Sequence, residues 1–222
     1  GIIQYALDKF KTVKLKDGTY KIKDQLTLNK NRVLIGSQNT VIDASLVYAN
    51  SAIRLNDSSS LSNLTIDNAK ARGIRPYKNS TIYRIKIKNT GVDSPHNEKG
   101  QAIYCGGINS YNVVVVGVEA YNSYNAADEP GSQNERLLDE KKYGVWPSKT
   151  NGGHSMGFRL KDGAHNITFI DCHAHHNAGD GYDFAKRGSG TTIDDKKISV
   201  DVFYSSAIFN GNPLRNLNKG LE

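Results

Sequence analysis

The residues best placed to do chemistry form a row that the sequence repeats. Five segments share one pattern: Ser51-Ala-Ile-Arg-Leu, Arg72-Gly-Ile-Arg-Pro, Gln101-Ala-Ile-Tyr-Cys, Met156-Gly-Phe-Arg-Leu and Asp180-Gly-Tyr-Asp-Phe. When their central apolar residues are aligned (Ile53, Ile74, Ile103, Phe158 and Tyr182), the next position holds Arg54, Arg75, Tyr104, Arg159 and Asp183. Successive strand side chains point to opposite faces, so this row is expected on one outward face. A basic and aromatic row suits a groove for an acidic polymer.

Arg159 and Lys161 combine two chemical roles on one strand. They alternate along it, so both side chains are expected to face outward, roughly 6 to 7 Å apart. Arginine offers a carboxylate two parallel donors and stays charged. A lysine accepts a proton only when neutral, a form that a neighbouring guanidinium favours. Gly106 falls at the Lys161 position one repeat earlier, where we expect open space beside the ammonium. The alternative is that both cations only solvate the surface.

The elements that must position these residues follow from a second repeated pattern. Its members are Leu61/Leu64/Ile66, Ile82/Ile85/Ile87, Val113/Val116/Val118, Ile167/Ile170/Cys172 and Val200/Phe203/Ser205. The first repeats are 21 residues long, from Ile53 to Ile74 and from Leu61 to Ile82. Two strands per repeat at this period are typical of a parallel β-helix, in which no coil buries its apolar face alone. Asparagines tolerate left-handed turns, and their amides can bond the backbone or one another, so five of them are expected to close the coils: Asn68, Asn89, Asn122, Asn177 and Asn210.

The predicted fold class is therefore all-β, a single-domain right-handed parallel β-helix over residues 1–222. Residues 1–12 are expected to form an N-terminal cap, with a short amphipathic helix from Gly1 to Phe10 over the open end of the coil. A long loop, residues 126–153, should lie over the groove, since long loops in compact repeats usually serve function. Residues 212–222 are expected to form a C-terminal tail.

Charge and composition limit the partners. The net charge is +7, from 29 Lys and Arg against 22 Asp and Glu, which favours an anionic partner. The cations are dispersed through a repeat that also carries tyrosines, and no nucleic-acid motif is present, so an acidic polysaccharide is favoured over nucleic acid. No apolar run approaches the roughly 18 to 20 residues of a membrane span. We expect a secreted monomer whose signal peptide has been removed. Cys105 and Cys172 fall at inward positions, where they are either free or bonded to each other.

The stretch from Gly157 to Phe184 resembles the corresponding coils of pectate-lyase-like parallel β-helix proteins, particularly polysaccharide lyase family 9. In that family an Asp-Gly-Phe strand and an Asp-Asp-Gly-Trp-Asp strand one coil later provide calcium ligands. Here Met156 and Gly179 stand at two of the aspartate positions and leave only Asp180 and Asp183. Calcium takes six to eight oxygens, so a Ca²⁺ site at this pair is disfavoured, and neither metal nor other cofactor is expected. In size and architecture, nearly the whole chain is similar to the small alginate lyases of polysaccharide lyase family 31.

This resemblance implies an enzyme that cleaves a uronic-acid polysaccharide, alginate first of all, by β-elimination. Such a reaction needs a group that neutralises the carboxylate, a base and an acid. Arg159 would neutralise the carboxylate and Lys161 would transfer the proton. Tyr124 is the favoured acid, because it leads into the long loop, while Tyr104 and Tyr77 are alternatives. The substrate-binding residues would be Arg75, Tyr77, Tyr104, His154, Asp183, Lys186, Arg187, Tyr143 and Trp146.

Other functions stay open from the sequence. A pectate lyase is one alternative. A β-helix glycoside hydrolase would need a convergent pair of carboxylates, and Gly106-Gly107 face the region where such a pair would be expected. A non-catalytic carbohydrate-binding solenoid or adhesin is the strongest alternative from another class, because fold alone does not fix function.

Overall fold

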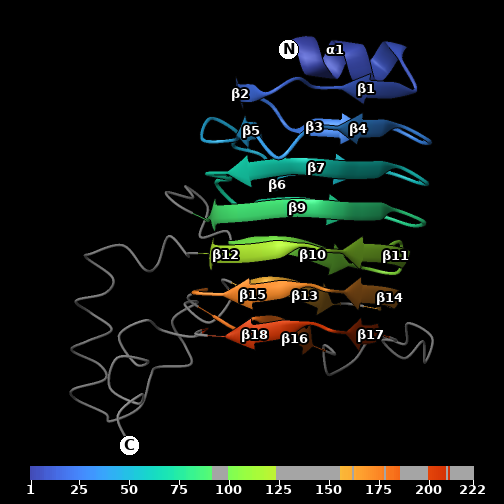
Figure 1. The fold of residues 1–222 in the computed structure, drawn as a ribbon. Helices are drawn as coiled ribbons and strands as arrows, with labels where there is room; N and C mark the ends of the chain where they lie inside the picture. Colours follow the sequence, from blue (N-terminus) through green and yellow to red (C-terminus); the bar gives the residue numbers. More distant parts are fainter. Residues whose placement is uncertain are drawn as a thin grey trace, which may run out of the picture.

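The computed structural model describes residues 1–91, 100–123, 156–161, 163–177, 179–185, 200–208 and 210. The expected long loop (126–153) and C-terminal tail (212–222) lie outside these residues. The described part is mostly β, with one short helix and two sheets whose strands all pair in parallel. Figure 1 shows the strands stacked in layers, with the helix α1 at the end where the chain begins. This confirms the all-β prediction, and the parallel sheets are compatible with a β-helix.

The smaller sheet carries the predicted row of cations. Its six strands, in spatial order, are β16 (Tyr182–Ala185), β13 (Met156–Lys161), β10 (Gln101–Gly106), β8 (Arg72–Pro76), β6 (Ser51–Leu55) and β3 (Leu26–Leu28). Ile53 pairs with Ile74, Ile74 with Ile103, Ile103 with Phe158 and Phe158 with Tyr182. The sequence alignment of the five segments is therefore confirmed strand by strand. The residue directly after each of these apolar residues points to the outer face of the sheet.

The larger sheet has twelve strands, which form two arms. The first arm comprises β1 (Thr12–Lys14), β4 (Val33–Ile35), β7 (Ser60–Asp67), β9 (Thr81–Thr90), β11 (Tyr111–Val116), β14 (His165–Ile170) and β17 (Val200–Phe203). The second comprises β2 (Gly18–Lys21), β5 (Thr40–Asp43), β12 (Glu119–Ser123), β15 (His173–His175) and β18 (Ser206–Ile208). β7 and β9 run through both arms and join them.

The predicted alignment of this second apolar pattern is wrong by two residues at one step, between the second and third coils, while Val113 pairs with Ile167 and Ile167 with Val200 as predicted. Leu61 pairs with Ile82 as expected, but Ile82 pairs with Val115 rather than Val113, and Val115 pairs with Phe169. Val113 and Val115 are both fully buried. A shift of two residues keeps every side chain on the same face, so the inward pattern alone could not fix the register.

Left-handed residues form bends that recur from coil to coil. Asn68, Asn89 and Asn122 have φ angles of 58°, 55° and 54°, which confirms their expected role. Asn177 acts through its amide, the other role expected of these asparagines, because Asn177 Nδ2 donates to Ala120 O at 3.1 Å and to Asn210 Oδ1 at 2.8 Å. The left-handed residue of this coil is the preceding one, His176, with a φ angle of 54°.

The helix α1 (Ile2–Lys9) covers the first strands, as expected of a cap. Ile3 and Leu7 are buried in the core, whereas Ile2 and Phe10 are 82% and 61% exposed. The helix also satisfies the edge of β3, since Thr27 N donates to Gln4 Oε1 at 2.8 Å and Gln4 Nε2 donates to Thr27 O at 3.1 Å. None of the described residues forms a helix long and apolar enough to span a membrane.

A continuous apolar core fills the space between the sheets. Phe158 and Phe169 meet there with ring centroids 5.2 Å apart, and Tyr182 stacks on Phe158 at 4.8 Å. Cys105 and Cys172 are buried and free, so they are not bonded to each other. Burial raises the pKa of Cys105 to about 12 and that of Cys172 to about 11, which keeps both thiols protonated at neutral pH.

Candidate functional site on the outer face of the small sheet

The registry of the small sheet brings several predicted site residues together. Tyr104 pairs with Arg159, and Arg159 with Asp183. Gly106 pairs with Lys161, which is partly buried on the neighbouring strand. These side chains therefore lie on three adjacent strands, β10, β13 and β16, at separations set by the roughly 4.8 Å spacing of paired strands.

Arg159 lies on the expected face but is covered rather than open. It is only 4% exposed, and its Nε lies 3.1 Å from Asp183 Oδ2. Its charge is thus held against a carboxylate of the protein itself. A substrate carboxylate would have to share this guanidinium with Asp183, so Arg159 is a pre-positioned cation and not a solvated one.

Asp180 adds a second carboxylate beside this pair. Loss of hydration and then the nearby charge of Asp183 raise the pKa of Asp180, while Arg159 acts in the opposite direction. Among the described residues, no group of three or more His, Cys, Asp or Glu side chains could hold a metal ion. Asp180 and Asp183 form a carboxylate pair beside the Arg159 guanidinium.

The expected open space at Gly106 does not exist. A Cβ atom at this position would collide with Cε1, Cζ and Oη of Tyr104. The Tyr104 side chain leans along its own strand and lies over Gly106, which only a glycine permits. The phenol hydroxyl is thereby brought next to the strand position that pairs with Lys161. Sequence reasoning placed Tyr104 in the Arg159 row and could not foresee this rotamer.

Arginines and tyrosines alternate along the rest of this face. The Arg54 guanidinium lies 4.6 Å from the Tyr77 ring centroid, and Arg75 lies 5.3 Å from Tyr77 and 5.8 Å from Tyr104. Arg72 covers Tyr104 at 4.4 Å, while its Nε donates to the buried Gln101 Oε1 at 2.8 Å. The arginine–tyrosine row is the name used below for Arg54, Arg72, Arg75, Tyr77 and Tyr104. Such contacts hold long cationic side chains in fixed positions on the sheet.

Two of the residues in the row, Arg54 and Arg72, were not among the predicted substrate-binding residues. Arg54 aligns with Arg75, so the repeat carried a signal for it. Arg72 begins its strand and reaches the row only through the direction of its side chain. Other predicted residues lie outside the described part of the chain: Tyr124, Tyr143, Trp146, His154, Lys186 and Arg187.

A groove on the larger sheet was not predicted from the sequence. It has a volume of about 510 Å³ and lies where the two arms of the larger sheet meet. Polar residues from several coils line it, among them Asn63, Arg84, Glu119 and His173. Arginine is not a residue type that predicts a left-handed bend, yet the φ angle of Arg84 is 50°.

The comparisons with known proteins add no relative to this description. No family model, no curated protein and no solved structure matches the chain.

Proposed function

We propose that this chain is a right-handed parallel β-helix and that it cleaves a uronic-acid polysaccharide, alginate first of all, by β-elimination. The observation that supports this most is the arginine–tyrosine row, which leads on the same outer face to Arg159 and Lys161. We also propose that the protein acts as a secreted monomer and needs no metal.

The row suits a chain of negatively charged sugars. Each guanidinium can donate two parallel hydrogen bonds to a carboxylate. Because Arg54 and Arg72 already rest on tyrosine rings, less side-chain entropy is lost when a carboxylate binds. Successive cations on neighbouring strands would then meet successive uronates of one extended polymer.

The reaction divides among three groups. Arg159 stabilises the negative charge that develops on the uronate carboxylate when the C5 proton leaves. Lys161, in its neutral form, accepts that proton. The electron pair of the C5–H bond forms the C4–C5 double bond, the bond from C4 to the glycosidic oxygen breaks, and a tyrosine hydroxyl protonates the leaving oxygen.

Tyr104 is the described tyrosine best placed to be that acid. Its ring lies over Gly106, the residue paired with Lys161, so base and acid would flank the same sugar. Tyr124, the acid favoured from the sequence, lies outside the described residues and remains the other candidate. Tyr77 is held between Arg54 and Arg75, further from Lys161 along the sheet.

A non-catalytic carbohydrate-binding solenoid is the second candidate function. The ion pair between Arg159 and Asp183 favours it, because a cation already matched by a carboxylate is typical of a structural contact. The same arginine–tyrosine row would serve binding without chemistry.

One assay separates the candidates. The protein is incubated with alginate, pectate and a glycosaminoglycan, and the ultraviolet absorbance of conjugated uronate is followed together with reducing ends. Elimination produces both signals, hydrolysis produces reducing ends alone, and a binding protein produces neither. Saturable binding without either signal would overturn the lyase and support the second candidate.

A further inference from the structure

The groove on the larger sheet follows a line of left-handed residues. Asn63, Arg84, Gly117 and Asp171 have φ angles of 56°, 50°, 63° and 52°, and they occupy four successive coils at the bend between the two arms. Three steps between paired strands give the line a length of roughly 14 Å. A groove of this length fits an extended chain better than a single small molecule.

Arg84 lies along the floor of this groove. Its Cγ is 3.4 Å from the place where a Cβ of residue 117 would be, so the arginine stem runs alongside the Gly117 backbone of the next coil at contact distance. A non-glycine residue other than Asn or Asp rarely adopts this backbone conformation, and the strain is typical of functional positions. Its guanidinium lies 5.0 Å from the ring centroid of the neighbouring Tyr83.

The other charges that line the groove have partners inside the protein. Lys86 Nζ lies 3.1 Å from Glu119 Oε2, and this contact raises the pKa of Lys86. Glu119 also accepts from His175 Nε2 at 3.1 Å. Among the described carboxylates, none forms an ion pair with Arg84. Arg84 is therefore the cation of this groove that is available to an anion.

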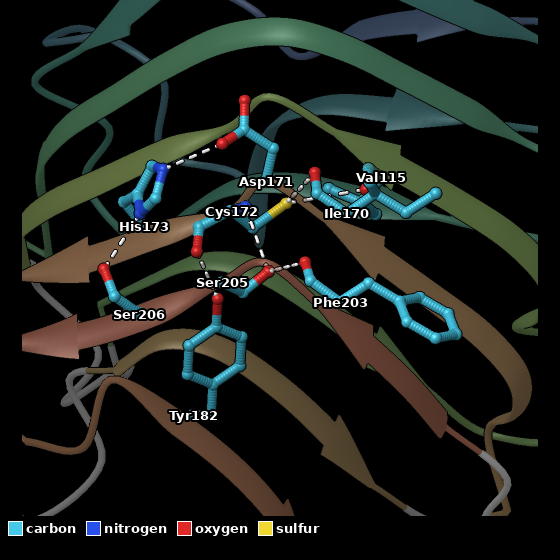
Figure 2. Close-up of polar contacts among 9 residues, drawn as sticks. All are labelled: Val115, Ile170, Asp171, Cys172, His173, Tyr182, Phe203, Ser205 and Ser206. Carbon is cyan, nitrogen blue, oxygen red and sulfur yellow. Dashed lines mark hydrogen bonds and ion pairs between the residues drawn. The ribbon is translucent and has the colours of Figure 1, made fainter.

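The end of the groove formed by Asp171 and His173 carries groups that can bond sugar hydroxyls. Figure 2 shows His173 held between Asp171 and Ser206, with His173 Nε2 at 3.1 Å from Asp171 Oδ1 and His173 Nδ1 at 2.8 Å from Ser206 Oγ. Asp171 would repel a carboxylate but accept a hydrogen bond from a sugar hydroxyl. The amides of Gln38 and Asn63 line the groove as well and can bond either kind of group.

We infer that this groove is a second binding site for an acidic oligosaccharide, with a uronate carboxylate on Arg84 and sugar hydroxyls toward Asp171. The inference takes its ligand class from the proposed function, but it requires no cleavage. Its chemistry is that of a surface site that holds the polymer while another face acts on it. The separation of charges along the groove would also fix the direction of the bound chain.

The test follows an oligogalacturonate and an oligomannuronate of defined length by NMR at low salt, with a neutral oligoglucoside as control. We expect shifts of the Arg84 Nε–H and Gly117 amide signals with both uronates and none with the neutral sugar. In Arg84→Asn the affinity measured at the Gly117 amide signal should fall at least roughly tenfold, because one charge-assisted contact is lost. Asn tolerates the left-handed backbone, so the melting temperature should be unchanged or higher.

Lys14→Asn is the matched control, since it removes the same charge from the exposed end of β1, outside the groove. Its affinity should equal that of the wild type. Unmoved Arg84 and Gly117 signals, or equal affinity in Arg84→Asn and Lys14→Asn, would overturn the second site. Signals of Tyr104 and the ultraviolet assay report on the small sheet independently, so loss of the proposed lyase activity and loss of this site are distinguishable.

Discussion

At the scale of single residues, the Tyr104 ring is the feature that most constrains the chemistry. It fills the space over Gly106, and the Arg72 guanidinium lies 4.4 Å from its ring centroid. Its hydroxyl is therefore held and does not sweep the surface. For the proposed proton transfer, a hydroxyl held over Gly106, the residue paired with Lys161, would be a better donor than one that must find its place during each turnover.

This arrangement predicts the outcome of three substitutions. Lys161→Ala should abolish most elimination without loss of fold, because the side chain is only partly buried on the outer face. Of Tyr104→Phe and Tyr124→Phe, the variant that removes the acid should lose turnover by about two orders of magnitude or more, while substrate affinity persists. Turnover and affinity are measured separately, and circular dichroism checks the fold. Full activity in Lys161→Ala would reduce the row to a binding surface.

The carboxylate pair formed by Asp180, just before β16, and Asp183, on β16, predicts that the stability of the fold depends on pH. The raised pKa of Asp180 means that the folded protein binds this proton more tightly than the unfolded chain. The stability that Asp180 contributes is therefore fully present at pH values below 3.8, the ordinary pKa of an aspartate. It is lost as the pH rises through the raised pKa of the folded protein. Asp180→Asn is neutral throughout and should melt higher than the wild type near neutral pH.

Thermal melts of both proteins at about pH 3 and about pH 7 would check this. The difference in melting temperature should shrink at the lower pH, where the wild-type carboxyl is also neutral. A difference of the same size at both pH values would show that the gain comes from the amide itself and not from the removed charge.

At the scale of elements, the helix α1 carries a stabilising role that can be separated from its exposed surface. Leu7 is fully buried against the first coil, so Leu7→Ala should lower the free energy of unfolding by about 2 to 4 kcal/mol. Ile2→Ala, on the same helix but 82% exposed, is the control and should change it by less than about 0.5 kcal/mol. Urea unfolding measures both. Equal effects would mean that the helix does not dock as described.

The strands show what alternation in the sequence can and cannot predict. In the small sheet each segment follows its central apolar residue, from Ile53 to Tyr182, with an Arg, Tyr or Asp, and this recurring pair of residues indicates the register. In the large sheet, Val113 and Val115 are equally good partners for Ile82, and the hydrophobic pattern cannot choose between them. The burial of Arg159 depends on side-chain rotamers, and the groove at Arg84 depends on left-handed bends of the backbone. Neither leaves a periodic signal in the sequence.

At the scale of the whole molecule, the proposed chemistry rests on side chains and not on a metal. Treatment with EDTA should therefore leave both the initial rate of elimination and the melting temperature nearly unchanged. A loss of activity restored by Ca²⁺ would mean that Asp180 and Asp183 belong to a calcium site completed by residues outside the described part of the chain.

The like-on-like pairing of the small sheet has a consequence for how such a chain can grow. Ile53 pairs with Ile74 and Arg54 with Arg75, so at these two positions of the small sheet one coil meets the next through the same residue types. A tandem duplication of this 21-residue stretch would insert one more layer that keeps the same pairs at these two positions. It would also lengthen the arginine–tyrosine row by about 4.8 Å. The length of polymer that the surface accommodates is thus a quantity that copying, rather than point substitution, can change.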